Sequence, residues 1–185
     1  MKRTIIASVF VLVLAAGQAA AADGQFSLFA GYLDPGELTL ENVEESFEFR
    51  GTSVYGLRIE FDFLKLFGVE QNLAFSPRLF DSALFPDEAG EVRGLLYSSN
   101  LVINLPVGRF VPYVTGGIGQ MTPWGTDIDV FDTTFAGNYG GGIKLNRLFG
   151  PVGLRFDVRG WRTADIDNQG GINIFEATGA VTFTW

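Results

Sequence analysis

The stretch FEATGAVTFTW, Phe175–Trp185, alternates between two kinds of side chain up to the last position of the chain. One kind is aromatic, aliphatic or small, and the other is mostly polar. The first set is Phe175, Ala177, Gly179, Val181, Phe183 and Trp185, and the second is Glu176, Thr178, Ala180, Thr182 and Thr184. Because successive side chains of a β-strand point to opposite faces, this pattern predicts a strand with one apolar and one polar or small face.

Seven earlier segments alternate in the same way, and each has about the 9–11 residues that a tilted strand needs to cross a membrane. The clearest is Thr52–Phe63, in which Leu57 lies on the face opposite to Arg58. A membrane-spanning barrel strand has this organisation, with an apolar face towards lipid and a polar face towards the lumen. The segments are Gln25–Tyr32, Thr52–Phe63, Gly68–Phe75, Val92–Leu105, Phe110–Gln120, Phe135–Leu145 and Val152–Trp161.

Two of these segments are less regular than the others. In the third segment, Gln71 interrupts the apolar face. The fifth segment is rich in glycine, so its pattern fits either facing. We expect Val114 and Ile118 to point outward, with Gly117 and Gly119 pointing inward.

The connections between the segments alternate in length, which is typical of an up-and-down barrel with short periplasmic turns and longer extracellular loops. The short turns hold Lys65, Arg109 and Arg147 without an acid, whereas the long connections hold most of the acids. The sequence therefore predicts an all-β chain: an eight-stranded antiparallel up-and-down transmembrane β-barrel with acidic extracellular loops. The short connections are residues 64–67, 106–109 and 146–151, and the long ones are residues 33–51, 76–91, 121–134 and 162–173.

The N-terminus has the organisation of a secretory signal peptide. Lys2 and Arg3 form a basic start, an apolar run follows, and small residues precede Asp23. We predict a signal peptide over residues 1–22, removed after Ala22, and a barrel domain over residues 23–185. Cleavage after Ala21 is the alternative. The apolar run is shorter than the ~20 residues of a membrane-spanning helix. We expect the exported chain in the outer membrane of a diderm bacterium.

The composition excludes several classes of function. The chain carries 13 basic and 21 acidic residues, which disfavours a nucleic-acid partner because phosphate contacts need clustered Lys and Arg. It has no histidine and no cysteine, the residues on which the common nucleophilic triads and nearly all zinc sites depend. We therefore predict no enzyme activity, no cofactor and no metal centre. Asp127, Asp129 and Asp132 leave a loop-bound cation open as an alternative.

The glycine-rich strands give the chain a family resemblance. The stretches Pro112–Gly119, Gly140–Lys144 and Val152–Arg159 resemble the small outer-membrane β-barrel family, which includes OmpA-type, OmpX-type and OmpW-type barrels. The resemblance extends over essentially all of the chain after residue 22. It implies a barrel surrounded by outer-membrane lipid, and it specifies an architecture better than it specifies an activity.

Aromatic side chains are expected at both membrane boundaries of such a barrel. Phe183 and Trp185 also resemble the C-terminal signal that the bacterial barrel-assembly machinery reads, so this machinery is an expected partner during biogenesis. The residues expected near the periplasmic boundary are Phe61, Phe63, Phe110, Phe149, Phe183 and Trp185, and those expected near the outer boundary are Tyr32, Phe75, Tyr97, Phe135, Tyr139 and Trp161.

The charged residues within the segments fall on the face opposite to the apolar one. This face lines the lumen of a membrane-spanning barrel, and an eight-stranded barrel is narrow enough for side chains to fill it. Because buried charges have to be paired, we predict salt bridges across the lumen. A hydrated path or a gate made of the same ion pairs is the alternative. The predicted lumen charge network is Arg58, Glu60, Asp62, Glu70, Lys144, Arg155, Asp157, Arg159 and Glu176.

Together these features predict a non-enzymatic integral outer-membrane β-barrel protein with a structural or surface-interaction role and a side-chain-filled lumen. The alternative is a narrow pore or a barrel that transports hydrophobic compounds. A soluble lipocalin-like barrel is the rival fold, and it would bury its apolar face and expose its charges. Outward-facing Arg58, Glu60 and Arg155 would favour that rival. No ligand for the loops follows from the sequence.

Overall fold

The computed structural model describes residues 23–34, 37–39, 46–48, 51–63, 65–80, 92–124, 133–163 and 173–185. The predicted signal peptide and most residues of the long connections lie outside these ranges. Within these ranges, the regular secondary structure consists of β-strands alone. The same residues contain no helix that is long and apolar enough to span a membrane.

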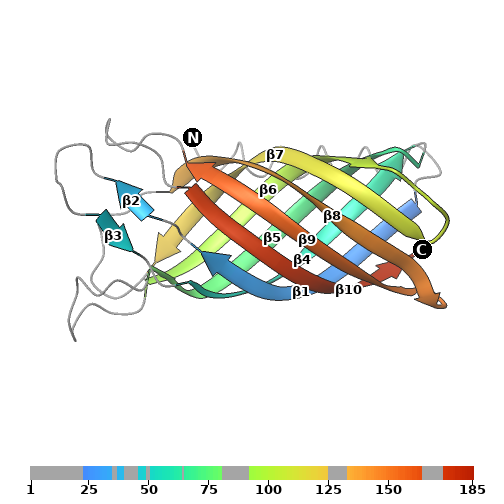
Figure 1. The fold of residues 1–185 in the computed structure, drawn as a ribbon, viewed down its shortest axis with the longest axis horizontal. Coiled ribbons are helices and arrows are strands. Elements are labelled where there is room, and N and C mark those ends of the chain that lie inside the picture. The colour runs from blue at the N-terminus through green and yellow to red at the C-terminus, as the bar shows by residue number, and fades with distance from the viewer. Residues whose placement is uncertain are drawn as a thin grey trace, which may run out of the picture.

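Eight strands form a closed antiparallel barrel in the order β1-β10-β9-β8-β7-β6-β5-β4 around its wall (Figure 1). The barrel closes where β1 pairs with both β4 and β10. The predicted eight-stranded antiparallel barrel is therefore confirmed. Its strands are β1 (Asp23–Asp34), β4 (Thr52–Phe63), β5 (Phe67–Phe80), β6 (Val92–Asn104), β7 (Phe110–Trp124), β8 (Thr134–Phe149), β9 (Val152–Thr163) and β10 (Asn173–Thr184).

Two further strands, β2 (Glu37–Thr39) and β3 (Ser46–Glu48), form a separate two-stranded sheet. This pair lies beyond one end of the barrel, and the C-terminus lies at the other end (Figure 1). The first long connection therefore contains strands where the sequence indicated only a loop. The pattern missed them because three residues are too few to show an alternation.

The short connections are tight turns at the barrel end that holds the C-terminus. In one of them, Val107 and Phe110 exchange backbone hydrogen bonds of 2.8 and 3.2 Å. Gly108 lies between them with a φ of 66°, which glycine adopts without strain because it has no Cβ. Such a turn joins neighbouring strands directly, so it fixes their antiparallel register.

The glycine-rich β7 has the facing that the sequence favoured. Val114 and Ile118 are 57% and 76% exposed on the outer wall. Gly117 lies on the inner face, where a Cβ in its place would be 2.2 Å from Asn100 Oδ1. At this position the inner face of β7 therefore has to stay small so that Asn100 of β6 fits in the lumen.

The charges of β4 and β9 point into the barrel. Arg58, Glu60 and Arg155 are at most 1% exposed, whereas Phe156, the next residue along β9, is 53% exposed. An apolar outer wall around a charged interior is the reverse of a lipocalin-like barrel. The structure therefore contradicts that rival fold.

Trp161 was expected in the outer aromatic girdle, and the structure shows this expectation to be wrong. Its side chain is 1% exposed and points into the barrel, where its indole Nε1 donates a 2.9 Å hydrogen bond to Glu176 Oε2. The reason is the strand period: Trp161 is separated from Arg155 and Arg159 by even numbers of residues, so it shares their inner face.

The interior also contains apolar side chains, which collect near the strand ends that lead into the long connections. We call this group the outer apolar layer. All of its members are at most 4% exposed, and they come from all eight barrel strands. The layer consists of Leu33, Val54, Leu79, Leu96, Met121, Ala136, Trp161 and Ile174.

A β-bulge brings one of these residues into the layer. The pairing of β5 with β6 shifts register between Ser76 and Phe80. Between these two pairs β5 advances four residues while β6 advances two, so the regular alternation of side-chain facing is interrupted there. Leu79 consequently lies inside with no exposed surface, next to Gly94 on β6.

Candidate functional site

Eight charged side chains from five strands meet in the middle of the lumen, and none is more than 5% exposed. Four are cations and four are anions, so their formal charges cancel. Every one takes part in at least one ion pair. The eight are Arg58 and Glu60 on β4, Glu70 on β5, Lys144 on β8, Arg155, Asp157 and Arg159 on β9, and Glu176 on β10.

Arg58 connects β4 with β9 and β10. Its Nη1 lies 2.7 Å from Asp157 Oδ2, and its Nη2 lies 2.9 Å from Glu176 Oε1. The Nε atom donates a 2.9 Å hydrogen bond to Asn72 Oδ1, and the guanidinium carbon lies 3.9 Å from the centroid of the Phe29 ring. The guanidinium is therefore held on its edges by oxygen atoms and on one face by an aromatic ring.

Arg155 occupies the centre of the network. Its Nη1 lies 3.1 Å from Glu60 Oε2 and its Nη2 lies 2.6 Å from Glu70 Oε2. Its Nε donates a 2.8 Å hydrogen bond to the Tyr113 hydroxyl, and Asp157 Oδ2 lies 3.5 Å from the same nitrogen. One side chain of β9 thus contacts groups on β4, β5 and β7.

Arg159 and Lys144 complete the pairing. Arg159 lies 2.8 Å from both Glu70 Oε1 and Asp157 Oδ1, through Nη1 and Nε. Lys144 Nζ pairs with Glu60 Oε1 and donates a 2.8 Å hydrogen bond to Asn104 Oδ1. The two carboxylates Glu60 and Glu70 are therefore each shared by two cations, which favours a fixed arrangement.

Asp62 was predicted as a ninth member of the network, but within the described residues it makes no ion pair. It lies near the end of β4, is partly exposed, and accepts a 2.8 Å hydrogen bond from Asn104 Nδ2. Its carboxylate is closer to the barrel end with the short turns than the other charges of β4 are.

Neutral polar side chains that were not predicted as site residues complete the lumen. Asn100 donates to Glu70 at 2.9 Å and accepts from Asn138 at 2.9 Å. Asn72 and Tyr113 each contact an arginine, as described above. All four lie on the lumen face, Asn72 and Asn138 on strands whose charges were singled out and Asn100 and Tyr113 on β6 and β7, where none was. The alternation that placed the charges therefore also contained these residues.

Trp161 connects the charged middle of the lumen with the outer apolar layer. Its indole donates to Glu176 Oε2 while Arg58 pairs with Glu176 Oε1. The lumen is therefore filled at two consecutive levels, first by ion pairs and then by apolar side chains. Within the described ranges, no group of three or more His, Cys, Asp or Glu residues is placed to hold a metal ion. Asp127, Asp129 and Asp132 lie outside those ranges.

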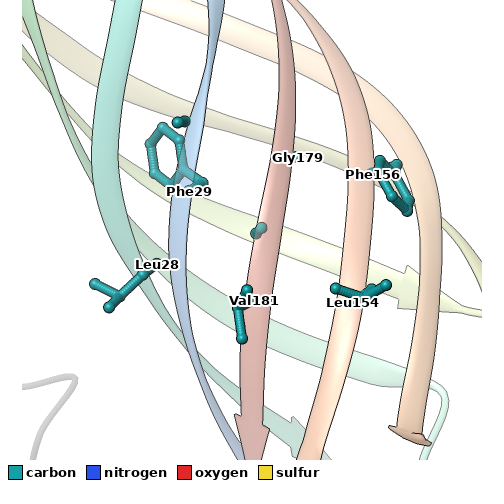
Figure 2. Close-up of a pocket in the computed structure, with 8 residues that line it drawn as sticks. Leu28, Phe29, Leu154, Phe156, Gly179 and Val181 are labelled. Atoms are coloured by element: carbon teal, nitrogen blue, oxygen red, sulfur yellow. The ribbon is translucent and has the colours of Figure 1, made fainter.

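The outer wall has a shallow groove of about 450 Å³ where β1, β10 and β9 lie side by side. Figure 2 shows Gly179 on β10 between the β1 residues and Phe156 of β9. Ala30 and Gly179 are cross-strand neighbours and leave the wall low at this point, and Leu28 and Phe156 stand beside them. All residues that line the groove are apolar or glycine, which suits an environment of acyl chains.

The C-terminal residue is held against the start of β1. Trp185 and Gly24 exchange backbone hydrogen bonds of 3.0 and 3.3 Å. The Trp185 ring makes an edge contact with Phe61, with centroids 6.4 Å apart. A Cβ at Gly24 would lie 2.2 Å from the indole ring, so a larger residue here would require the ring to move. Trp185 is nevertheless 60% exposed.

A closed barrel with an apolar outer wall and a charged, filled lumen defines the class of transmembrane β-barrels. Residues 8–177 match the family described as outer membrane protein beta-barrel domain. The chain therefore belongs to this family, and its outer wall meets the lipid of a membrane. No curated protein sequence matches the chain.

Solved structures with the same fold include three outer-membrane barrels. The N-terminal barrel of OprF from Pseudomonas aeruginosa is 14% identical, with 88% of this chain and 97% of that chain covered and a TM-score of 0.57. Neisserial surface protein A is 10% identical, with 90% of this chain and 100% of that chain covered and a TM-score of 0.61. OprG from Pseudomonas aeruginosa is 13% identical, with 89% of this chain and 96% of that chain covered and a TM-score of 0.58. At these identities the similarity shows the fold alone.

Proposed function

We propose that the chain is a non-enzymatic integral protein of the outer membrane of a diderm bacterium, with a structural or surface-interaction role. The observation that carries this proposal is the lumen, in which eight buried charges are paired across the barrel below an apolar layer. Because the interior is filled in this way, the long connections are the parts of the barrel that can contact other molecules. These connections are rich in acids, and most of their residues lie outside the described ranges.

The ion pairs oppose the passage of a solute for a physical reason. A solute entering the middle of the lumen would have to separate pairs such as Arg155 with Glu70, and each separated charge would be left poorly solvated. Beyond them, Trp161 and the other apolar side chains offer a permeating ion no hydrogen bonds. The two levels together support a non-conducting barrel.

The absence of an apparent catalytic centre among the lumen residues supports the non-enzymatic part of the proposal. A general acid or base must reach the proton that it transfers. Glu60, Glu70, Asp157 and Glu176 are buried, and cations or hydrogen-bond donors occupy their oxygens. These carboxylates are therefore suited to holding the barrel together and poorly suited to meeting a substrate.

We expect purified protein refolded into planar bilayers to give no resolved single-channel conductance. The reason is the double filling of the lumen by the charge network and the outer apolar layer. Single-channel recording in concentrated KCl is the measurement, with a large porin in the same bilayers as the positive control. Discrete, reproducible steps would contradict the proposal and favour the narrow pore.

Transport of hydrophobic compounds is the second candidate, and the groove between β1 and β9 is the observation that favours it. The groove is apolar and opens towards lipid, but its floor is the barrel wall. Exchange of an apolar dye across liposome membranes can distinguish transport from the structural role. Faster exchange of an apolar dye in liposomes with the protein than in protein-free liposomes would favour transport; equal exchange would favour the structural role.

We also infer that Phe183 and Trp185 act as the assembly signal read by the barrel-assembly machinery. Trp185→Ala should reduce the fraction of folded barrel in liposomes that contain the purified machinery, because it removes the exposed terminal aromatic ring. Trp185→Phe should restore folding. Phe175→Ala is the matched control, since Phe175 is 50% exposed on the outer wall of the same strand. Equal folded fractions for the two alanine variants, measured by heat-modifiable gel mobility, would refute the assignment.

A further inference from the structure

A basic side chain lies at each of the three short connections, at the barrel end that holds the C-terminus (Figure 1). Lys65 lies between β4 and β5, and Arg109 lies between β6 and β7. Arg147 lies near the end of β8, within the register shift that precedes the turn into β9. All three are exposed, and none belongs to the salt bridges found among the described residues. We call Lys65, Arg109 and Arg147 the basic rim.

Two of these cations have a backbone conformation that favours glycine. Lys65 has a φ of 63° and Arg147 has a φ of 54°, and within the described ranges no other non-glycine residue has a positive φ. A Cβ is strained in this left-handed region, and glycine avoids the strain. Gly108 and Gly150 take the same conformation in two of the short turns. A strained residue that glycine could replace is a reason to look for a function outside the fold.

Backbone hydrogen bonds hold the three turns in place. Each turn accepts one such bond from a strand of the next hairpin along the chain. The backbone positions of the basic rim are therefore fixed around the end of the barrel, and the cations do not depend on a long loop for their placement. The bonds run from Asn104 N to Leu66 O (2.7 Å), from Asn146 N to Arg109 O (2.9 Å) and from Thr184 N to Pro151 O (2.9 Å).

An exposed phenylalanine follows each cation within two residues. Phe67, Phe110 and Phe149 are 46%, 43% and 80% exposed. Aromatic rings near the end of a membrane-spanning barrel mark the level at which acyl chains meet headgroups. The basic rim lies next to this level on the side of the turns, so its charges meet the phosphate groups of the membrane surface.

Two acidic side chains lie at the same end, but they belong to the lumen face. Asp23 and Asp62 are cross-strand neighbours on β1 and β4. Asp62 is two residues from Glu60, and Asp23 is two residues from the buried Gln25, so the strand period places both acids on the inner face. The negative charge at this end is therefore directed towards the barrel axis, whereas the cations lie on the turns.

We propose that the basic rim binds the phosphate groups of anionic phospholipids in the leaflet that surrounds the short turns. The proposal rests on membrane insertion and is independent of whether the barrel has a structural or a transport role. Arginine binds phosphate through paired hydrogen bonds, and lysine binds it as a point charge. An anionic membrane surface attracts each such cation. The long connections at the other end hold most of the acids, so the two barrel ends differ in their attraction to anionic lipid.

Trp185 lies where it can report the lipid composition beside the basic rim. Its ring contacts Phe61 near the end of β4, the strand that leads to Lys65. The preceding residue, Thr184, donates its backbone hydrogen bond to Pro151 in the turn after Arg147. Trp185 is 60% exposed, so lipid can reach its ring.

Quenching of Trp185 by brominated lipids measures the enrichment of anionic lipid. Trp124→Phe removes one other tryptophan, and Trp161 is buried in the lumen. Liposomes contain phosphatidylcholine with a minor fraction of phosphatidylglycerol. In one sample the phosphatidylglycerol carries bromine on its acyl chains, and in the other an equal amount of the phosphatidylcholine does. We expect brominated phosphatidylglycerol to be enriched about two- to fivefold near Trp185 at low salt. Concentrated KCl should remove the enrichment, because salt screens exposed charges.

Replacing all three residues of the basic rim with glutamine should also remove the enrichment. The matched control replaces three exposed arginines near the strand ends that lead into the long connections, and it changes the net charge by the same amount. Heat-modifiable gel mobility reports whether each variant is folded. The salt series uses the unchanged rim, so it tests the proposal even where the rim variant does not fold. The control residues are Arg78, Arg93 and Arg162.

The backbone strain gives a separate test of whether the fold itself needs a rim cation. Lys65→Gly removes a Cβ from the left-handed region, so its urea midpoint in phosphatidylcholine alone should equal or exceed that of the parent protein. The same variant should show part of the loss of enrichment, since it removes one of three cations. A lower midpoint would show that the turn requires the lysine, and it would overturn the assignment of Lys65 to lipid.

The outcomes of the quenching experiment distinguish binding at the rim from other causes. Enrichment that salt and the rim substitutions remove, and that the control variant retains, supports the proposal. Equal quenching by the two brominated lipids at low salt would overturn it. Enrichment that persists in the folded rim variant would assign the lipid to another surface. An equal loss in the control variant would assign the effect to net charge alone, and either result would also overturn the proposal.

Discussion

Arg155→Ala should lower the free energy of unfolding by about 3–5 kcal/mol, since removing one partner of a buried ion pair leaves uncompensated charge. Arg155 lies within ion-pair distance of Glu60, Glu70 and Asp157. After the substitution, Glu60 and Glu70 each retain only one of their two cations. Reversible unfolding in urea, followed by gel mobility and tryptophan fluorescence, gives the midpoint and the slope.

Arg109→Ala is the matched control for this measurement. Arg109 is an exposed residue in the turn between β6 and β7, so its charge is solvated before and after unfolding. Exposed charges of this kind contribute about 0–1 kcal/mol. Equal midpoints for the two variants, at unchanged slope, would mean that water reaches the lumen and that the network does not fill it.

A double-mutant cycle can assign the effect to a particular pair. We expect Glu70→Gln alone to be destabilising. It should destabilise less in the Arg155→Ala background, because Arg155→Ala leaves the Glu70 carboxylate without this cation and Glu70→Gln then removes that carboxylate charge. Residues in one ion-pair network have interaction energies of about 0.5–3 kcal/mol. Additive effects of the two substitutions would contradict a direct contact between Arg155 and Glu70.

The barrel was predictable because one rule governs most of its residues. A side chain of a membrane-spanning strand meets either lipid or lumen, so the facing of Leu57 and Arg58 follows from their neighbours alone. The same rule places Trp161 inside with Arg155 and Arg159. The expectation of an aromatic girdle contradicted the strand period at that residue, and the strand period was the better guide.

The outer apolar layer was harder to foresee because it lies at the strand ends. Leu33 and Met121 fell in segments that the alternation indicated to be loops. A strand continues beyond its own regular pattern wherever a neighbouring strand still offers backbone partners. In this way β7 extends to Met121 and further, because Met121 is paired with Leu96 of β6. A single sequence does not contain that information.

The partners within the lumen also depend on the closed geometry. The period shows that Arg155 and Glu60 point inward, but they are 95 residues apart in sequence. Their contact results from the stagger of β4 relative to β9, which barrel closure sets. Neutral partners such as Tyr113 and Asn72 were missed because only charges were singled out on the lumen face.

Trp161→Ala is the second substitution with a large expected effect. It should lower the free energy of unfolding by about 3–5 kcal/mol, because a buried aromatic side chain is lost and a cavity remains. Glu176 Oε2 also loses the indole donor, although Arg58 still holds the other oxygen. Trp161→Phe should cost less, since it keeps most of the apolar volume and removes only the donor. Phe135→Ala is the control: Phe135 is also aromatic but is 72% exposed on the outer wall.

The location of Trp161 can be measured independently of stability. Phospholipids with brominated acyl chains quench tryptophans that contact lipid, and the chain has three tryptophans. Because Trp161 is 1% exposed and points into the lumen, Trp161→Phe should remove fluorescence that these lipids do not quench. The remaining fluorescence should therefore be quenched to a larger fraction than in the parent protein. A smaller quenched fraction would place Trp161 against lipid. It would also undermine the apolar level of the lumen, because no other side chain of the outer apolar layer has comparable volume.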